Sequence, residues 1–548
     1  MNICKLMVKI MDKKVIIGVV AVVLVIIVAA FALMGGSHDN DPTHLTVAAH
    51  SNIKEPDAGF SPLVGWGCGH QNYNPLVQSC LFKTDKNGSI IPDLATDYSI
   101  SEDGKTWTVH VRDDVVFSDN STFDAEDVAF TFNTAKETES ELDLTNIEKV
   151  TATDNNTVKF KLVEPRSTFI YDLRYVGIVP SDSYNNETYG SEPIGTGPYV
   201  LDHWDKGQQA IFKVNDNYYG DKPYFTQLTL LFPEEATWLE LAKSGDVDVV
   251  PVATSALNQT VDGYQFVEKS AGRAQGVSFP YLEDTGNVSP GGYKIGNNVT
   301  SDKAIREALN VGVDRQKMCD DVFAGHASPE YTSVDTRDYT NPDAKVKDGD
   351  VNKAKEILKE GGWKDTDGDG IVEKDGVKAS FDLYYPPDYL DRQSLSTVFA
   401  EQAKEIGIEV NLKGADWDTI YANMYSSAAL MQQTSPDPYK SIYQQYHSKE
   451  ADDFYMNPGL YNNTDSDKLM DEAMHSSDLN AANKLWSDSA LVNGGGWGPA
   501  GDAPFAWLVN YDYNYFIKDG IDIGEQPDGL GNDILINICE WTRTNSTA

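Results

Sequence analysis

The hydrophobic pattern begins with a run of 20 residues without a charge, Val15–Met34. Such a run is about the length that crosses a hydrocarbon core as a helix. It is preceded by one acid, Asp12, and by four lysines, Lys5, Lys9, Lys13 and Lys14. Because positive charge marks the cytoplasmic side, the pattern predicts a retained membrane anchor with the rest of the chain outside the cell. A cleaved signal peptide is the alternative, since Ala30-Phe31-Ala32 resembles a small-residue cleavage site.

Beyond this run, stretches in which every second residue is apolar alternate with stretches in which apolar residues recur at helical spacing. The predicted strands are His44–His50, Trp107–Val111, Thr157–Leu162, Ala210–Val214 and Ile408–Leu412. The predicted helices are Ala125–Lys136, Ala236–Ser244, Asp302–Gly312, Val351–Glu360 and Ser394–Ile406. Because helices and strands alternate in both halves, the pattern indicates α/β lobes instead of an all-β sandwich or a solenoid.

Length and charge narrow the function class. A chain of 548 residues suggests about two to four domains, and 41% apolar residues indicate a folded protein. The formal net charge of −40 excludes nucleic-acid binding through a basic surface, because phosphate contacts need clustered Lys and Arg. Nine Asn-x-Ser/Thr sequons are consistent with a glycoprotein in an exported chain.

A series of motifs then follows in a fixed order along the chain. They are Ile91–Ala95, Ser101–Val115, Phe117–Asp119, Phe123–Val128, Pro193–Tyr199, Asn217–Gly220, Leu241–Asp248, Ile305–Asn310, Val313–Arg315 and Ala354–Trp363. Together they resemble the peptide/nickel group (family 5) of extracytoplasmic solute-binding proteins of ABC transporters. With its N-terminal anchor, the chain resembles the archaeal type of this family.

The resemblance implies a two-lobe α/β fold, like that of periplasmic binding proteins, with a large first lobe that the C-terminal tail rejoins. We expect an anchor or signal segment at 1–36, a tether at 37–45, lobe one at 46–278, lobe two at 279–503 and a return to lobe one at 504–548. The first crossing is placed near Ser278 and the return near Ala503. The lobes of such a protein close on a ligand by a hinge motion.

One segment that reaches the ligand in this family corresponds here to Phe60–Asn74. Its ligand-binding candidates are Trp66, Cys68, His70, Asn72 and Tyr73. Trp66, Cys68 and His70 alternate with glycines, so an extended loop presents all three on one side. Cys and His suit a borderline divalent metal such as nickel, and organic ligand contacts or plain packing are the alternatives.

The second ligand segment is Leu430–Tyr439, which gives the candidates Thr434, Asp437, Tyr439 and Tyr443. In the family's peptide binders an Asp that pairs with the ligand's α-amino group corresponds to Thr434. In its nickel binders a His follows the Asp-Pro, where this chain has Tyr439. Neither anchor is therefore present, and the class of ligand stays open. Trp417 is a further candidate for the cleft or for the core.

Asp365, Asp367 and Asp369 occupy positions 1, 3 and 5 of a calcium-type loop, with Gly370 at the turn. Position 12 is Gly376, so the expected bidentate carboxylate is missing, and the alternatives are a partial calcium site or a simple turn. Cys68, Cys80, Cys319 and Cys539 follow the apolar run, and the sequence does not determine whether or how they pair.

The function that the resemblance implies is capture of a small extracellular solute for an ABC importer, with a peptide or peptide-like molecule as first choice. A nickel ion or nickel chelate is the alternative, and a non-transport surface protein on the same fold is the second alternative. The expected partners are the ligand, the permease subunits and the membrane, and the protein is expected to be a monomer without a required cofactor. We expect no catalysis, because His-Glu-x-x-His, Gly-x-Ser-x-Gly and phosphate-loop motifs are missing from the sequence.

Overall fold

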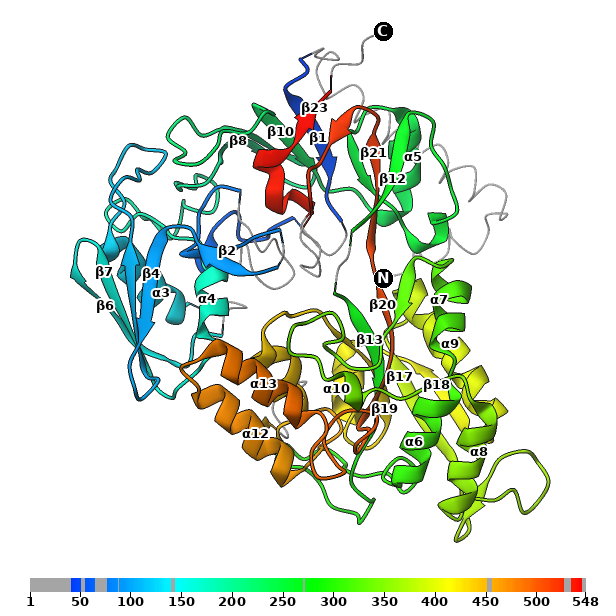
Figure 1. The fold of residues 1–548 in the computed structure, drawn as a ribbon. Coiled ribbons are helices and arrows are strands. Elements are labelled where there is room, and N and C mark those ends of the chain that lie inside the picture. The colour runs from blue at the N-terminus through cyan, green and yellow to red at the C-terminus, as the bar shows by residue number, and fades with distance from the viewer. Residues whose placement is uncertain are drawn as a thin grey trace, which may run out of the picture.

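A computed structural model describes residues 41–50, 55–64, 76–86, 88–138, 143–269, 272–450, 456–526 and 534–544. The predicted anchor Val15–Met34 lies outside these ranges. Within them, no helix has both the length and the apolar character needed to cross a membrane. The chain forms two α/β lobes, one above the other in Figure 1, so the predicted α/β class is confirmed.

The first lobe is built on a seven-stranded mixed sheet of order β12-β21-β11-β1-β10-β9-β8. β1 pairs in parallel with β10 and β11, and β21 runs antiparallel to β11 and β12. The strand bounds are β1 His44–Ala48, β8 Tyr199–Asp205, β9 Gln209–Val214, β10 Gln227–Leu231, β11 Val249–Pro251, β12 Tyr264–Lys269 and β21 Tyr513–Lys518. The helix predicted at Ala236–Ser244 is α5, Trp238–Ser244, which a 3₁₀ turn at Glu235–Thr237 precedes.

A four-stranded antiparallel sheet of order β4-β5-β7-β6 forms a separate part of the first lobe, at the left of Figure 1. Its elements are β4 Ala95–Ile100, β5 Thr106–Val111, β6 Ile147–Asp154 and β7 Thr157–Leu162, with α3 Ala125–Lys136 and α4 Phe169–Tyr175. The bounds of α3 agree with the prediction, because a capping box of Asp124 and Asp127 satisfies the first amides of that helix. The two-stranded sheet of β2 Phe82–Thr84 and β3 Ile90–Pro92 lies close to α4.

The second lobe is built on a six-stranded sheet of order β14-β20-β13-β19-β17-β18. The strands are β13 Ala274–Ser278, β14 Ala327–Pro329, β17 Ser380–Tyr385, β18 Glu409–Gly414, β19 Ala428–Gln433 and β20 Phe505–Tyr511. One core cluster joins this sheet to α6 Lys303–Gly312, α7 Arg315–Phe323, α8 Val351–Glu360 and α9 Leu390–Glu405. A second cluster joins it to α10 Trp417–Asn423, α12 Thr464–His475 and α13 Leu479–Ser489. The sheet is thus covered on both faces, and α9 begins four residues before the predicted Ser394.

The chain changes sheet twice, and these changes define the hinge. β12 belongs to the first sheet and β13 to the second, whereas β20 belongs to the second and β21 to the first. The crossings therefore fall at residues 270–273 and at Asp512. We keep the division into lobes as a proposal, with its crossings placed at these positions instead of near Ser278 and near Ala503.

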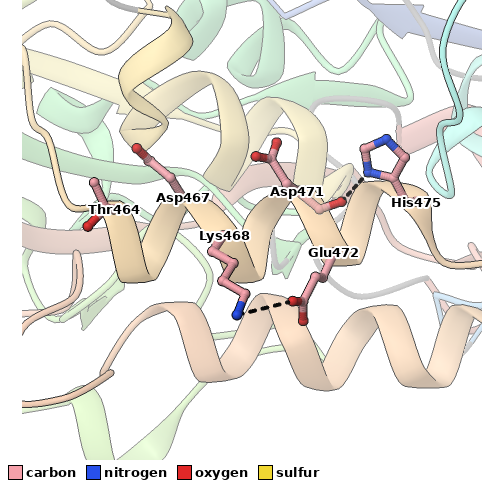
Figure 2. Close-up of a pocket in the computed structure, with 6 residues that line it drawn as sticks. All are labelled: Thr464, Asp467, Lys468, Asp471, Glu472 and His475. Carbon is pink, nitrogen blue, oxygen red and sulfur yellow. Dashed lines mark hydrogen bonds and ion pairs between the residues drawn. The ribbon is translucent and has the colours of Figure 1, made fainter.

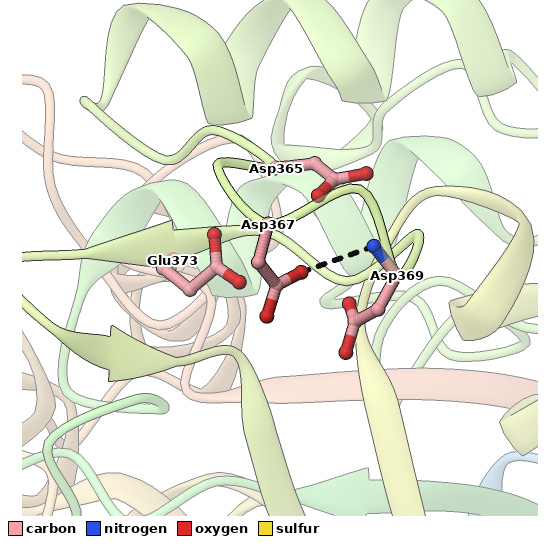
Figure 3. Close-up of side chains that lie close together, drawn as sticks. All are labelled: Asp365, Asp367, Asp369 and Glu373. Carbon is pink, nitrogen blue, oxygen red and sulfur yellow. Dashed lines mark hydrogen bonds between the residues drawn. The ribbon is translucent and has the colours of Figure 1, made fainter.

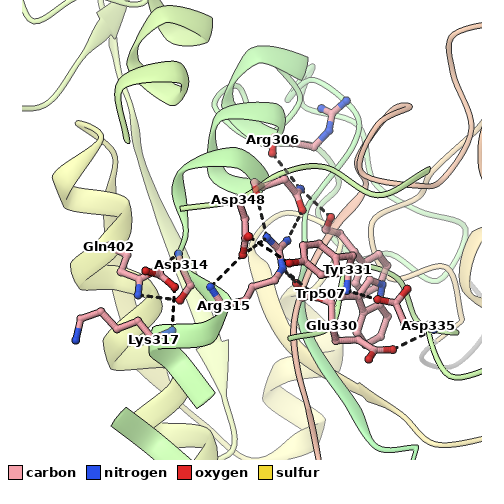
Figure 4. A network of polar contacts seen from close by, with 12 residues as sticks. Arg306, Asp314, Arg315, Lys317, Glu330, Tyr331, Asp335, Asp348, Gln402 and Trp507 are labelled. Atoms are coloured by element: carbon pink, nitrogen blue, oxygen red, sulfur yellow. Dashed lines mark hydrogen bonds and ion pairs between the residues drawn. The ribbon is translucent and has the colours of Figure 1, made fainter. Parts of the chain in front are cut away.

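A buried arginine in α7 ties the parts of the second lobe together (Figure 4). The Arg315 side chain is fully buried. Its Nε donates to the carbonyl oxygens of Glu330 and Trp507, and its Nη1 donates to the carbonyl of Asn310. A carboxylate of Asp348 lies 3.3 Å from Nη1. The motif Val313–Arg315 thus has an architectural role in this chain.

Candidate functional site

The candidate ligand residues of the second lobe cluster on the turn that follows β19. Thr434 directly follows the strand, and its amide donates to Gln433 Oε1 at 2.9 Å. Asp437 lies two residues before a π-helical turn, Tyr439–Tyr443, and accepts a hydrogen bond from the amide of Tyr439 at 2.9 Å. The rings of Tyr439 and Tyr443 stack with centroids 5.6 Å apart. The structure therefore brings Asp437, Tyr439 and Tyr443 together on one short segment.

Asp437 is fully buried and forms an ion pair with the other lobe. Arg166, which lies between β7 and α4, has Nη2 3.2 Å from Asp437 Oδ2 and Nη1 3.0 Å from Asp172 Oδ2. The guanidinium carbon lies 4.2 Å from the centroid of the Tyr439 ring. We call Arg166, Asp172, Asp437 and Tyr439 the Arg166 cluster. Asp437, a candidate ligand contact, is thus already paired across the lobes in this structure.

A backbone contact next to the Arg166 cluster also joins the lobes. The amide and the hydroxyl of Ser167 donate to the carbonyls of Met474 and Ala473, both at 2.8 Å. These carbonyls lie at the C-terminal end of α12, where a helix leaves its last acceptors without internal donors. The first lobe therefore caps a helix of the second lobe, and this contact forms only when the lobes are together.

Burial dominates the electrostatics of the Arg166 cluster. It raises the pKa of Asp172 to about 6, while Arg166 acts to lower that pKa and Asp437 to raise it. Burial alone would lower the pKa of Arg166, but the two carboxylates outweigh this effect and the pKa is raised. Burial also raises the pKa of Tyr439 to about 12. Arg166 and Lys440 both favour the charged form of Asp172, and burial nevertheless keeps its pKa raised.

Replacing Asp172 with asparagine is expected to change how stability depends on pH between about pH 4 and pH 6. The folded-state pKa of Asp172 lies above its ordinary value of 3.8, so in this window the folded protein holds a proton that the unfolded chain releases. This group therefore stabilises the fold at low pH, and that contribution is lost as pH rises through the window. Denaturant titrations of wild type and D172N at pH 4, 5, 6 and 7 measure the difference. Parallel pH profiles would contradict this assignment.

The remaining lobe-two candidates lie in different surroundings. The Tyr443 hydroxyl donates to Asp471 at 3.0 Å, and its ring stacks on His447 at 4.2 Å. Trp417 is the half-buried first residue of α10, and the Arg392 guanidinium lies 5.5 Å from its ring. Trp417 therefore belongs to a second group of residues, near the hinge.

The first-lobe candidates Trp66, Cys68, His70, Asn72 and Tyr73 lie outside the described residues, so their roles stay predictions. Within the described residues, Cys319 and Cys539 form no disulfide, and Cys80 is buried.

The loop that contains Asp365, Asp367 and Asp369, which we call the aspartate loop, lies next to a fourth carboxylate that the sequence pattern did not predict. Ligand oxygens of Asp365, Asp367, Asp369 and Glu373 lie within 4.8 Å of one another (Figure 3). Glu373 begins β15, Glu373–Lys374, which pairs with β16, Val377–Lys378, and it accepts a hydrogen bond from the amide of Thr366. The Lys378 ammonium pairs with Asp369. These hydrogen bonds are those of a β-hairpin, and the Lys378 ammonium already balances one of the carboxylates. Calcium binding here stays a prediction.

A surface depression follows one face of α12, lined by Thr464, Asp467, Lys468, Asp471, Glu472 and His475 (Figure 2). Lys468 lies 3.9 Å from Glu472 within the helix, whereas Asp467 and Asp471 accept hydrogen bonds from the Ser448 and Tyr443 hydroxyls outside it. All six residues come from α12, the helix whose C-terminal end Ser167 of the first lobe contacts.

Comparison with known proteins decides the family. The profile of the bacterial extracellular solute-binding proteins, family 5 (middle region), matches residues 89–514. The chain belongs to this family. Protein XP55 of Streptomyces lividans is 32% identical over 510 residues, which cover 89% of this chain and 88% of that protein. The oligopeptide-binding protein AppA of Bacillus subtilis is 28% identical over 451 residues, which cover 78% of this chain and 80% of that protein.

A solved structure shows that this family 5 chain has the expected two-lobe fold. The crystal structure of NikZ from Campylobacter jejuni, in complex with Ni(L-His), matches with a TM-score of 0.72 at 22% identity. The match covers 92% of this chain and 100% of that one. The predicted two-lobe α/β fold of the periplasmic-binding-protein type is therefore confirmed.

The sequence did not point to Arg166, Asp172, Arg273 or Arg392 as residues of interest. The structure places Arg392 in the first turn of α9, where a cation opposes the helix dipole, but the predicted start at Ser394 left this arginine outside the helix. Arg166 gave no signal, because its partner Asp437 is 271 positions away along the chain.

Proposed function

We propose that this family 5 protein captures a small extracellular solute between its two lobes and delivers it to the permease of an ABC importer. The observation that carries the proposal is the double crossing at 270–273 and Asp512, where the chain passes between the sheets of the two lobes at a hinge. A ligand that contacts both lobes would favour their closed arrangement. The chain itself is not expected to catalyse a reaction.

A peptide or peptide-like molecule is the first choice of solute. The name of AppA, which aligns with 78% of this chain, describes an oligopeptide-binding protein. Thr434, Tyr439, Tyr443 and Trp417 are the proposed contacts in the second lobe, and Trp66, Cys68, His70, Asn72 and Tyr73 are those in the first. Asp437 would contact the ligand only if its pairing with Arg166 changed.

A nickel chelate is the second candidate, favoured by the Ni(L-His) complex of the structural neighbour NikZ. Cys68 and His70 are the proposed metal contacts. Replacing both with alanine would weaken nickel binding if this alternative holds. Unchanged nickel affinity in C68A/H70A would remove these two residues as ligands.

We also propose that Val15–Met34 anchors the protein in the membrane, as in the archaeal type of the family. The protein is further proposed to be glycosylated and to be a monomer. Seven sequon asparagines fall within the described residues and all are exposed: Asn120, Asn155, Asn186, Asn258, Asn287, Asn298 and Asn462. Such positions are accessible to a glycan on an exported protein. A non-transport role on the same fold stays the alternative to import.

Ligand capture is expected to raise the melting temperature of the purified protein. A ligand that binds only the folded state stabilises it by about 2.7 kcal/mol at a concentration 100 times its Kd. We would screen dipeptides and oligopeptides, then Ni²⁺ with and without L-histidine, by thermal unfolding. Native mass spectrometry of the purified protein would identify a solute already bound. The proposed solutes would be wrong if none shifted the melting temperature and no bound mass of either class appeared.

A further inference from the structure

Arg392 is a buried cation with unused hydrogen-bond donors. It lies in the first turn of α9, where positive charge is unfavourable, and it is 7% exposed. Its Nη2 donates to Gln432 Oε1 at 2.8 Å, whereas its Nε and Nη1 are buried without an acceptor. A buried charged donor without an acceptor is costly, and the contacts of the guanidinium group with the Tyr389 and Trp417 rings do not supply the missing acceptors.

A second arginine converges on the same amide oxygen. Arg273, 5% exposed, donates from Nε to Gln432 Oε1 at 2.9 Å. It lies at the first crossing between the lobes, and its amide donates to Asn510 Oδ1 at 2.9 Å. Its guanidinium carbon lies 4.4 Å from the Tyr511 ring and 5.3 Å from the Tyr513 ring, on either side of the second crossing. Arg273 therefore joins both strands of the hinge.

The charges around the two guanidinium groups leave Arg392 undercompensated. Asp391, the neighbouring acid, accepts a hydrogen bond from the Tyr511 hydroxyl at 2.9 Å. Burial lowers the pKa of Arg392, and the charge of Arg273 lowers it further, against the raising effects of Tyr511 and Asp391. Glu235 and Asp512 line a small hinge pocket that also contains Arg273 and Asp391 but not Arg392. An anion next to Arg392 would supply the missing acceptor.

We propose that Arg392, supported by Arg273 and Gln432, forms an anion subsite at the hinge that takes a carboxylate or a similar oxyanion. The guanidinium group offers an oxyanion two edges, one formed by Nε and Nη2 and the other by Nη1 and Nη2. Each edge therefore contains one of the two nitrogens that lack an acceptor, Nε or Nη1. Tyr389 covers the group, with its ring 4.5 Å from the guanidinium carbon, and it is 39% exposed and makes no side-chain cap on α9. A turn of the Tyr389 side chain opens the subsite.

The anion has two sources, which share this chemistry. It is either a carboxylate of the captured solute, in which case the inference rests on the proposed function, or a free inorganic or organic anion. The Trp417 ring, 5.5 Å from the Arg392 guanidinium carbon, links the subsite to a residue proposed to contact the solute. In either case the anion acts next to Arg273, so its binding affects both crossings of the hinge.

The test compares full-length wild type with R392M, with R392K, which keeps the charge but not the fork, and with R112M as a control. Arg112 forms a surface pair with Asp114, away from the hinge. Thermal unfolding and calorimetry are run with acetate and sulfate against chloride at equal ionic strength, and with trialanine against trialanine amide. Without these anions, R392M is expected to be as stable as wild type or more stable, because it removes an unpartnered buried donor.

Two results support the subsite. If acetate or sulfate stabilises wild type and R112M but not R392M, the site takes free anions. If trialanine binds at least about tenfold more tightly than its amide, as expected for one charged hydrogen bond, and R392M loses this preference while R112M keeps it, the site takes the solute's carboxylate.

Equal effects of every anion on wild type and R392M, together with equal binding of trialanine and its amide, would overturn the subsite and leave the proposed function intact. If neither peptide binds, the acetate and sulfate comparison still decides the subsite, while peptide capture loses support. Should R392M fail to fold, the same comparisons are made between wild type and R392K.

Discussion

Replacing Arg166 with methionine is expected to lower the free energy of unfolding by about 3–5 kcal/mol, the usual cost of removing one partner from a buried charge pair. The variant removes the one cation that forms an ion pair with both Asp172 and Asp437, whose side chains are more than nine-tenths buried. Equilibrium denaturation in urea near pH 7 measures the loss. The loss should shrink towards pH 4, because protonation of Asp172 removes part of the uncompensated charge.

A matched control distinguishes this effect from the loss of any arginine. R112M removes a surface pair with Asp114, and exposed pairs are worth about 0–1 kcal/mol. Because the Arg166 cluster joins the lobes, R166M should also increase the radius of gyration of the ligand-free protein in small-angle scattering. A stability loss no larger than that of R112M, with an unchanged radius, would show that the cluster does not hold the lobes together.

The sequence predicted local elements well wherever the signals are local. The bounds of α3, β7 and α8 agree with the prediction, because a capping box, a period-2 pattern and a Gly361-Gly362 stop each act over a few residues. The start of α9 was missed by four residues, because its first turn contains Asp391, Arg392 and Gln393 and makes no side-chain cap at Tyr389. The two-lobe fold followed from many motifs in order, not from any one of them.

The sequence could not predict contacts between distant segments. Asp437 was singled out on its own segment, whereas its burial depends on Arg166, which arrives from the other lobe. Glu373 joins the aspartate loop through the β15–β16 hairpin, and the loop pattern placed the missing carboxylate at position 12 instead. Arg273 precedes β13 and Gln432 lies on β19, so the pairing of these strands is what brings the two side chains within hydrogen-bond reach.

Replacing Arg315 with methionine is expected to have the largest effect on folding, a loss of about 4–5 kcal/mol or more. Arg315 satisfies the carbonyls of Asn310, Glu330 and Trp507 and the carboxylate of Asp348 (Figure 4). Each buried acceptor left without a donor costs about 1–3 kcal/mol, and losses of this size are expected where a buried network is broken. Urea titration followed by tryptophan fluorescence measures the change, and a low yield of folded R315M would agree with it.

The conservative variant R315K separates charge from geometry. Lysine keeps the positive charge near Asp348 but cannot reach acceptors on α6, β20 and the segment after β14 at once, because its three donors share one nitrogen. R315K should therefore recover only part of the stability that R315M loses. K317M is the control on the same helix, since Lys317 makes an exposed pair with Asp321 and its removal should cost no more than about 1 kcal/mol. Full recovery in R315K would show that charge, and not the arginine fork, holds these segments together, and the network would then be an electrostatic contact instead of a geometric one.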